Sequence, residues 1–343
     1  HRAFLSILAV LFWVVVLEAP AAEGASFYKG KTIRTVVGYS PGGGFDTFAR
    51  LLARHLGRYI PGKPKIIVQN MPGAGSLVAA NWVYAKQPGD GLTIATFHYG
   101  TVVLALSGEK TVKFDPMKYI WLGDPTIGGQ PEVLWVRSDL PIRTLEDLKK
   151  RKEPLALGAT GKSSGATVAG EFLRSLGYPV KNVLGYRGSA RTMAALERKE
   201  VDGRIMTQAT MQSIYRRFID EGLVRPIVSM GSDPRLKPLP GVPTLKDLKL
   251  NAEQLKLAEF LTTTWAMLRL YAVPPGTPPD RIKILQEAFL KALKSPKLIK
   301  DAERQGVVVD PLSAEQVTRT IQKLYQSPPE ILGKYGELIG MKK

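Results

Sequence analysis

The sequence predicts an α/β protein of two lobes, each with a mixed, mostly parallel sheet flanked by helices. Three observations support this fold class: β-type runs alternate with amphipathic helical stretches, glycine-rich turns separate them, and 343 residues suffice for two domains. With 44% hydrophobic and 23% charged residues, the composition is typical of a globular protein. No repeat or flexible linker interrupts the pattern, so we expect ordered strands to cross between the lobes.

The first α/β series occupies the N-terminal third of the chain. Strands are expected at 33–37, 66–68 and 92–96, with helices beginning near 46 and 76. In the first helix, helical spacing places on one face Phe48, Leu51, Leu52, His55 and Leu56. This stripe predicts a buried face, and we interpret His55 on it as a packed histidine in preference to a ligand.

A second series predicts strands at 155–157, 183–184 and 205–206, with helices between them. After the proline-rich turn 274–279, a helix is expected whose apolar face carries Ile282, Leu285, Phe289, Ala292 and Leu293. A strand is expected at 307–309. Ser313 followed by Gln316 forms a capping box that starts the final helix.

The first residues are typical of a secretory signal. Arg2 precedes an apolar run at 4–17, shorter than the roughly 20 residues of a spanning helix, and Ala19-Pro20-Ala21 supplies the small residues of a cleavage site. We therefore expect residues 1–21 to be a signal peptide and the mature protein to be exported. An uncleaved membrane anchor is the alternative.

Charge and composition exclude several classes of function. The net charge is +18, but Lys and Arg are scattered without stacking aromatic residues, and export argues against a nucleic-acid partner. The charge attracts small anions or simply solvates the surface. The absence of cysteine excludes disulfides, thiolate metal sites and cysteine nucleophiles. Because the chain has only three histidines, we expect no metal site, and no cofactor.

Two glycine-rich turns carry the strongest candidate binding chemistry. Each lies between a strand and a helix, in the segments Ser40-Pro41-Gly42-Gly43-Gly44-Phe45-Asp46 and Asn70-Met71-Pro72-Gly73-Ala74-Gly75-Ser76. At the carboxyl ends of parallel strands, backbone N–H groups converge and suit an anion. Either turn alone could merely connect its elements. Asp46 either caps the first helix or faces the ligand, and the aromatic residues of the loop 97–100 open on the same crevice or pack at its rim.

Three catalytic motifs match only in part. Gly161-Lys162-Ser163-Ser164-Gly165 fits a nucleophile elbow, but no histidine follows Ser163 in the chain. The same segment lacks the first glycine of a P-loop, where Ala156 stands, and Val78 replaces the last glycine of a dinucleotide fingerprint. We therefore expect no catalysis. A secreted serine hydrolase that uses Ser163 is the alternative.

The chain resembles the solute-binding receptors of tripartite tricarboxylate transporters, the Bug-type periplasmic family. The resemblance covers nearly all of the mature chain. It rests on segments that occur in the order of the family: 39–46, 70–75, 88–91, 186–188, 240–244 and 275–278.

This resemblance implies a two-lobed periplasmic-binding-protein fold of type II with a ligand cleft between the lobes. The first lobe would comprise 22–130 and 268–343, and the second 131–267. It implies a monomeric, non-enzymatic periplasmic receptor that captures a small carboxylate, such as a di- or tricarboxylate or an aromatic acid. The receptor would deliver this ligand to the membrane subunits of the transporter. A ligand sensor acting on a signalling partner is the alternative.

The resemblance also assigns the residues that grip a carboxylate, partly through water: Ser40, Gly42, Gly43, Asp46, Gly73, Ala74 and Gly75. Three residues, Tyr39, His98 and Tyr99, complete the candidate site of the first lobe. Closure of the second lobe is expected to add contacts from Thr160, Ser163, Ser164, Thr167, Tyr186, Arg187 and Thr207. Arg187 either pairs with a second carboxylate or is solvated. Ser163, Thr167 and Thr207 depart from the residues usual in the family, which leaves the ligand preference of the second lobe open.

Overall fold

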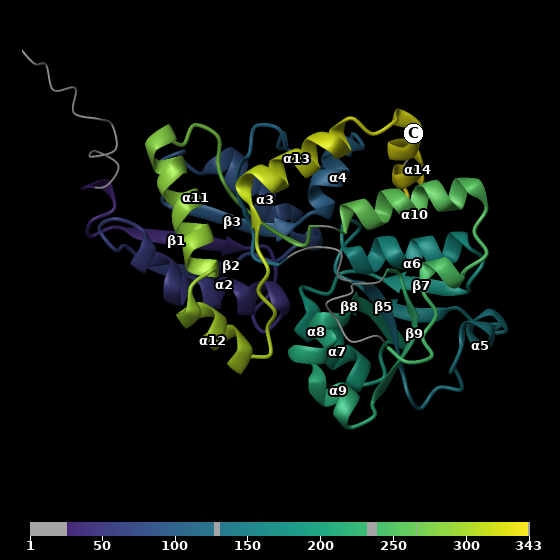
Figure 1. Cartoon of the computed structure of the whole chain (residues 1–343). Coiled ribbons are helices and arrows are strands. Elements are labelled where there is room, and N and C mark those ends of the chain that lie inside the picture. The colour runs from purple at the N-terminus through teal and green to yellow at the C-terminus, as the bar shows by residue number, and fades with distance from the viewer. Residues whose placement is uncertain (1–25, 127–130, 232–238, 266, 342–343) are drawn as a thin grey trace, which may run out of the picture.

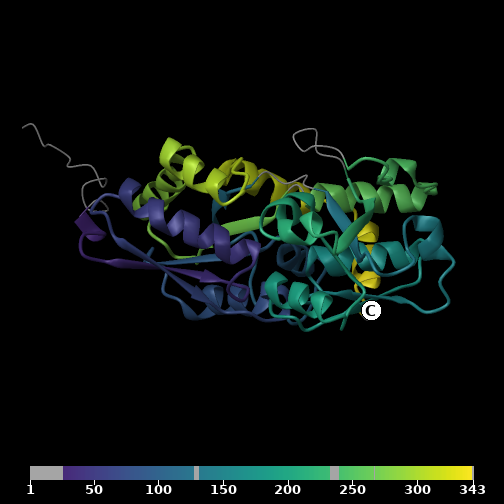
Figure 2. The ribbon, with the colours of Figure 1, turned by 90° about the horizontal axis from the view of Figure 1, so that it is seen from below.

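The computed structural model describes residues 26–126, 131–231, 239–265 and 267–341, so the expected signal peptide lies outside the described residues. The chain folds into two lobes, each with one mixed sheet and helices around it (Figure 1). Seen from below, the lobes lie end to end in an elongated molecule (Figure 2). The predicted two-lobed α/β fold is confirmed. Among the described residues, every helix is too short or too polar to cross a lipid bilayer.

The first lobe contains a six-stranded sheet in the order β11-β4-β10-β3-β1-β2. Its strands are β1 (Thr32–Val37), β2 (Lys65–Asn70), β3 (Thr93–His98), β4 (Ile120–Asp124), β10 (Arg269–Val273) and β11 (Leu312–Ser313). Strand β1 is parallel to β2 and β3, whereas β10 runs antiparallel between β3 and β4. The helices of this part are α2 (Gly44–Leu56), α3 (Leu77–Lys86), α4 (Gly100–Leu106), α11 (Pro279–Leu293), α12 (Pro296–Arg304) and α13 (Ala314–Tyr325).

The second lobe contains a five-stranded sheet in the order β7-β6-β8-β5-β9. Its strands are β5 (Glu132–Arg137), β6 (Leu155–Gly158), β7 (Val180–Val183), β8 (Gly203–Thr207) and β9 (Val224–Ser229). Strand β6 is parallel to β7 and β8, and β5 is antiparallel to β8 and β9. The helices are α5 (Leu145–Lys149), α6 (Gly165–Ser175), α7 (Ser189–Glu197), α8 (Gln208–Ser213), α9 (Arg216–Asp220), α10 (Ala252–Thr264) and α14 (Pro329–Leu338).

Local sequence patterns explain several of these elements. The apolar stripe of α2 is buried, and His55 on it lies 3.0 Å from the Asp301 carboxylate of α12, which confirms a packed histidine. Helix α13 begins with the predicted capping box: the Gln316 N–H donates to the Ser313 hydroxyl, and the Ser313 N–H donates to the Gln316 side chain. Both bonds satisfy backbone N–H groups that the first turn of a helix leaves without a partner.

Two expected strands differ from the structure. The strand expected at 183–184 is β7, which begins three residues earlier, at Val180. The prediction of a strand at 307–309 is wrong, because these residues adopt no regular secondary structure. The Val307 N–H instead donates to the Ala302 carbonyl and closes the end of α12. The short strand β11 follows this segment and pairs with β4.

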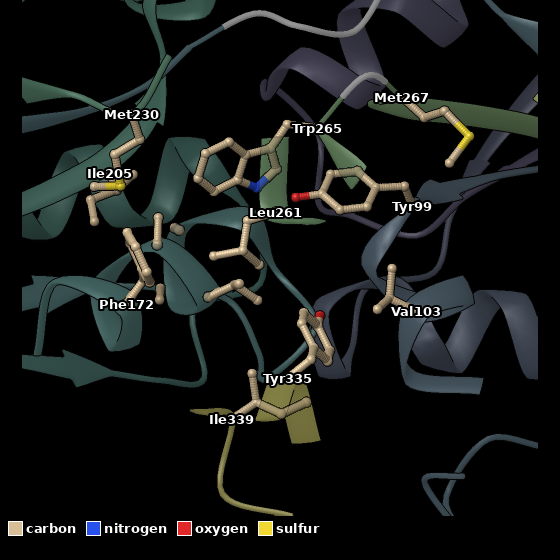
Figure 3. Close-up of a cluster of buried hydrophobic side chains, with 14 of the residues drawn as sticks. Tyr99, Val103, Phe172, Ile205, Met230, Leu261, Trp265, Met267, Tyr335 and Ile339 are labelled. Carbon is tan, nitrogen blue, oxygen red and sulfur yellow. The ribbon is translucent and has the colours of Figure 1, made fainter. Parts of the chain in front are cut away.

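The two lobes share one continuous apolar cluster. It includes residues from both sheets and from the helices α4, α6, α10 and α14. Figure 3 shows Tyr99 and Val103 at the start of α4 facing side chains of α10 and α14, among them Trp265 and Tyr335. Helix α13 packs on β4, but α14 packs against α6 and α10, so the last helix contacts the second lobe. The division of the chain at 130/131 and 267/268 stays a proposal.

The buried Tyr335 provides a test of this shared cluster. Tyr335→Ala is expected to lower the free energy of unfolding by about 3–5 kcal/mol, because it leaves a cavity beneath α14. Tyr335→Phe is the matched control. It keeps the ring and removes a hydroxyl that has no hydrogen-bond partner in the described part of the chain, so we expect little change. Urea denaturation measures both, and equal losses in the two variants would contradict the packing role.

Candidate functional site: the cleft between the lobes

A closed cleft lies between the lobes at the carboxyl ends of β1, β3 and β6. Its volume is about 70 Å³. This space is large enough to admit water. The cleft is lined by Tyr39, Gly44, Phe45, His98, Glu132, Thr160, Ser164, Gly165, Ala166, Ser189, Arg204, Ile205, Met206, Thr207, Thr210, Leu268 and Arg269.

Arg269 reaches the cleft from the first lobe. It is the first residue of β10, and its backbone N–H, like that of Leu268, donates to the Asp124 carboxylate at 2.7 Å. Its guanidinium lies 4.5 Å from the centroid of the Phe48 ring and donates to the hydroxyls of Thr126 and Thr210 at 3.2 and 3.4 Å. Burial lowers the pKa of Arg269 to about 10, so the group is still a cation at neutral pH.

Arg204 reaches the same cleft from β8 of the second lobe. Only 6% of its surface is exposed, and one terminal nitrogen donates to the Ser189 hydroxyl at 3.2 Å. Its Nε and Nη1 are buried without a partner among the described residues, and so is the Nε of Arg269. Buried charged donors without partners cost folding free energy. The cleft therefore contains donors that an anion would satisfy.

Glu132 is the acid of the cleft. It begins β5, is 5% exposed, and its Oε2 is buried without a hydrogen-bond partner in the described ranges. Burial raises the pKa of Glu132 to about 7, although Arg204 and Arg269 oppose the shift. At neutral pH this carboxyl group is therefore near its midpoint of ionisation.

His98 and Ser163 lie close together but do not form a catalytic pair. The His98 Nδ1 accepts the Gly100 N–H at 3.0 Å, and burial together with Arg269 lowers the pKa of His98 to about 3, so the ring is neutral. The fully buried Ser163 hydroxyl donates to the carbonyls of Ala74 and Gly75 at 3.4 and 3.3 Å. Ser163 thus holds the lobes together, and this geometry gives no support to the hydrolase alternative.

The first glycine-rich turn is organised by Asp46. The buried carboxylate accepts the Gly42 N–H at 3.0 Å, an Asn70 N–H at 2.9 Å and the Arg50 guanidinium. Burial alone would raise the pKa of Asp46, but the bonds from Arg50, Gly42 and Asn70 outweigh it and lower that pKa. Asp46 does not line the cleft. The N-cap of α2 is Gly43, without a side-chain cap, so Asp46 does not cap the helix as expected but ties Gly42, Asn70 and Arg50 together within the first lobe.

The second glycine-rich turn has an unusual backbone. Ala74, Gly75 and Ser76 adopt positive φ angles of 46°, 65° and 81° in succession. Non-glycine residues in this region cost of order 1–3 kcal/mol each and persist where surrounding contacts impose them. A Cβ at Gly75 would lie 2.6 Å from the Ser163 hydroxyl of the second lobe, and the φ of 65° also favours glycine at this position.

Both turns contact the second lobe directly. The Ser40 N–H donates to the Arg187 carbonyl at 2.8 Å, and the Tyr215 hydroxyl donates to the Gly42 carbonyl at 3.4 Å. A Cβ at Gly43 would lie 3.6 Å from the Ser189 Cβ. The turns thus form the contact surface between the lobes.

The predicted site residues fall into three groups. Those that line the cleft are Tyr39, His98, Thr160, Ser164 and Thr207. Those at the contact between the lobes are Ser40, Gly42, Gly43, Ala74, Gly75, Ser163 and Arg187. Of these, Arg187 contributes its carbonyl oxygen, and the residue is exposed. Those in neither group are Asp46, Gly73, Tyr99, Thr167 and Tyr186. Among them, the Thr167 hydroxyl donates to the Gly161 carbonyl. Ligand contact by any of these residues remains a prediction.

The charged residues of the cleft escaped the sequence-based prediction. Arg204, Arg269 and Glu132 were not among the expected site residues. The available signal was one arginine inside each of two apolar strand sequences, Gly203-Arg204-Ile205-Met206 and Leu268-Arg269-Leu270. Charged residues are rarely fully buried without a partner or a function.

Two α/β lobes with a cleft between them are also the architecture of several solved periplasmic binding proteins. The similar solved structures include the periplasmic binding protein BugD, which aligns with a TM-score of 0.74 and 21% identity over 92% of this chain and 100% of its own. MatC of Rhodopseudomonas palustris aligns with a TM-score of 0.68 and 22% identity over 90% of this chain and 99% of its own.

The family model described as tripartite tricarboxylate transporter family receptor matches residues 48–336, so the chain belongs to this family. It is 26% identical over 324 residues to a UPF0065 protein of Cupriavidus necator, covering 92% of this chain and 91% of the relative. It is 25% identical over 307 residues to protein BugT of Bordetella pertussis, covering 88% of each chain. The protein is therefore a solute-binding receptor and not an enzyme.

The raised pKa of Glu132 predicts a pH-dependent difference in stability. Between pH values of about 4.5 and 7 the folded protein keeps a proton that the unfolded chain releases, so folding loses stability as the pH rises. Relative to the native protein, Glu132→Gln is expected to gain up to roughly 3 kcal/mol in free energy of unfolding between pH 5 and pH 8. Urea denaturation without added ligand measures this. A pH-independent difference would show that Glu132 titrates normally.

Proposed function

We propose that this protein is a periplasmic receptor that captures a small carboxylate between its lobes. It then delivers this ligand to the membrane subunits of a tripartite tricarboxylate-type transporter. Family membership supports the receptor role. Relatives of similar fold are described with bound adipate and malate, two dicarboxylates, although at 21% and 22% identity they support only the fold. The observation that carries the ligand class is the pair of buried arginines with unpaired donors, Arg204 and Arg269.

Guanidinium groups suit a carboxylate for geometric reasons. The planar fork of an arginine matches the two oxygens of a carboxylate, and hydrogen bonds to charged groups contribute about 1.5–3 kcal/mol each. Arg269 belongs to the sheet of the first lobe and Arg204 to that of the second. An anion between them would bond to both lobes at once. Ligand binding and lobe closure would therefore stabilise each other.

The closed cleft must open before a ligand enters. Its volume of about 70 Å³ is less than a dicarboxylate needs. Opening breaks the contacts between the lobes, including the bond from Ser40 to the Arg187 carbonyl and that from Ser163 to the Gly75 carbonyl. A hinge motion of this kind would expose the arginines to solvent and to the ligand. The export signal at 1–21, the monomeric state and ligand contacts of the turns are parts of the same proposal.

Arg204→Met tests the ligand class. The ligand is first found by a thermal-shift screen of mono-, di- and tricarboxylates, because binding to the folded form alone raises the melting temperature. We expect Arg204→Met to weaken binding of that ligand at least tenfold, because a charge-assisted bond is lost. The melting temperature of the ligand-free variant should be unchanged or higher, since a buried unpaired cation is removed.

Arg216 provides the matched control for this variant. It is an exposed arginine of the same lobe that pairs with Asp220 outside the cleft. Arg216→Met should bind the ligand like the native protein in isothermal titration calorimetry. Native affinity in Arg204→Met would remove this arginine from the site.

A disulfide between the lobes tests whether the cleft must open. The chain has no cysteine, the separation of 3.6 Å at Gly43 and Ser189 suits a disulfide, and Gly43 has an ordinary φ of −99°. The double variant Gly43→Cys/Ser189→Cys is expected to lose ligand binding when oxidised and to regain it when reduced. The two single variants are the controls. Equal association rates of the oxidised and reduced forms would show that the ligand enters without opening.

A further inference from the structure

We propose that Glu132 is a specificity-determining residue of the cleft. It would select carboxylates that also carry a hydrogen-bond donor, a hydroxyl or ammonium group, over plain carboxylates of the same length. This inference rests on the proposed function and adds a second requirement to the ligand. The arginines would recognise an anion, whereas Glu132 in its ionised form is an acceptor that no anion satisfies.

The position of Glu132 is fixed by its surroundings. In the antiparallel ladder between β5 and β8, Glu132 lies opposite Thr207. The next two residues of its strand, Val133 and Leu134, are fully buried in apolar clusters. Its Oε1 lies so close to Gly165, at the start of α6, that a Cβ there would clash. The carboxyl group is therefore held at the wall of the cleft and does not swing away into solvent.

The acid and the arginines face the cavity without neutralising one another. No ion pair joins Glu132 to Arg204 or Arg269 among the described residues, although all three line the same cavity. The unpaired Oε2 thus coexists with unpaired guanidinium N–H groups. A ligand that satisfies both needs an acceptor at one position and a donor at another.

The partner of Glu132 must come from the side of the cleft. Behind it lies a second space lined by Tyr99, Glu132, Thr207, Trp265, Met267 and Leu268, which is too small for a water molecule. Figure 3 shows two of these residues, Tyr99 and Trp265, facing each other between the lobes. Since solvent does not reach the carboxyl group from behind, an unsatisfied Oε2 costs free energy until a ligand donates to it.

The charged and titratable groups around Glu132 also favour a ligand that carries a hydrogen-bond donor. Arg204 of β8 and Arg269 of β10 favour its ionised form, whereas the nearby His98 is neutral. The hydroxyls of Tyr39 and Tyr99 keep their protons because burial raises the pKa of both. A plain carboxylate bound by the arginines would repel an ionised Glu132. A hydroxyl or ammonium group on the ligand would instead bond to it.

Calorimetry with matched acids tests this selectivity. Three sets differ only in the donor group: propionate, lactate and alanine; succinate, malate and aspartate; phenylacetate, mandelate and phenylglycine. In at least one set, the native protein should bind a donor-bearing acid at least about tenfold more tightly than the plain acid. In Glu132→Met, which lacks the acceptor, this ratio should fall to within about threefold. The control Glu259→Met changes an exposed acid of α10 and should keep the native ratio.

The outcomes separate the two proposals. If the plain acids bind as tightly as the others, or if the ratio survives in Glu132→Met, the selectivity is overturned and the carboxylate receptor stands. If binding of plain succinate tightens between pH 8 and pH 6 and Glu132→Gln abolishes this change, Glu132 acts as a protonated donor, which also overturns the inference. If no acid of any set binds to the native protein, the proposed function itself fails.

Discussion

Unpaired charge buried between the lobes is the constraint on which the rest of this structure depends. Arg204, Arg269 and Glu132 are withdrawn from water, yet they do not form a salt bridge with one another in the described part of the chain. Such an arrangement destabilises the unliganded closed form. It is tolerated because the surrounding sheets and the shared apolar cluster contribute far more stability, and the anionic ligand that we propose would offset the cost.

The glycine-rich turns and the charged cleft have complementary roles. The turns bring the main chains of the two lobes together: a Cβ at Gly161 would lie 2.5 Å from the Gly75 nitrogen, so this approach requires a residue without a side chain. The strained angles of Ala74 and Ser76 indicate that the contact between the lobes is specified and not incidental. The turns thus define how the lobes meet, whereas the charges define what they enclose.

The sequence predicted those features that local patterns determine. The buried stripe of α2 and the capping box at Ser313 depend on neighbours a few residues away. The strand expected at 307–309 failed because a β-type run forms a strand only where another strand pairs with it. The burial of Arg269 could not be predicted from the sequence either. It depends on the insertion of β10 between β3 and β4, two strands that are far from β10 in the sequence. A charged residue inside an apolar run indicates a buried charge, but only the pairing of the strands shows which cavity this charge faces.

Helix α14 gives the molecule a third connection between its halves. The chain passes from one sheet to the other after β4, returns before β10, and passes again between α13 and α14. Two crossing segments alone would still allow the halves to twist and slide relative to each other. A third attachment, through the contacts of α14 with α6 and α10, would restrict that freedom further. Each cycle of opening and closure would then restore the same contacts between the lobes.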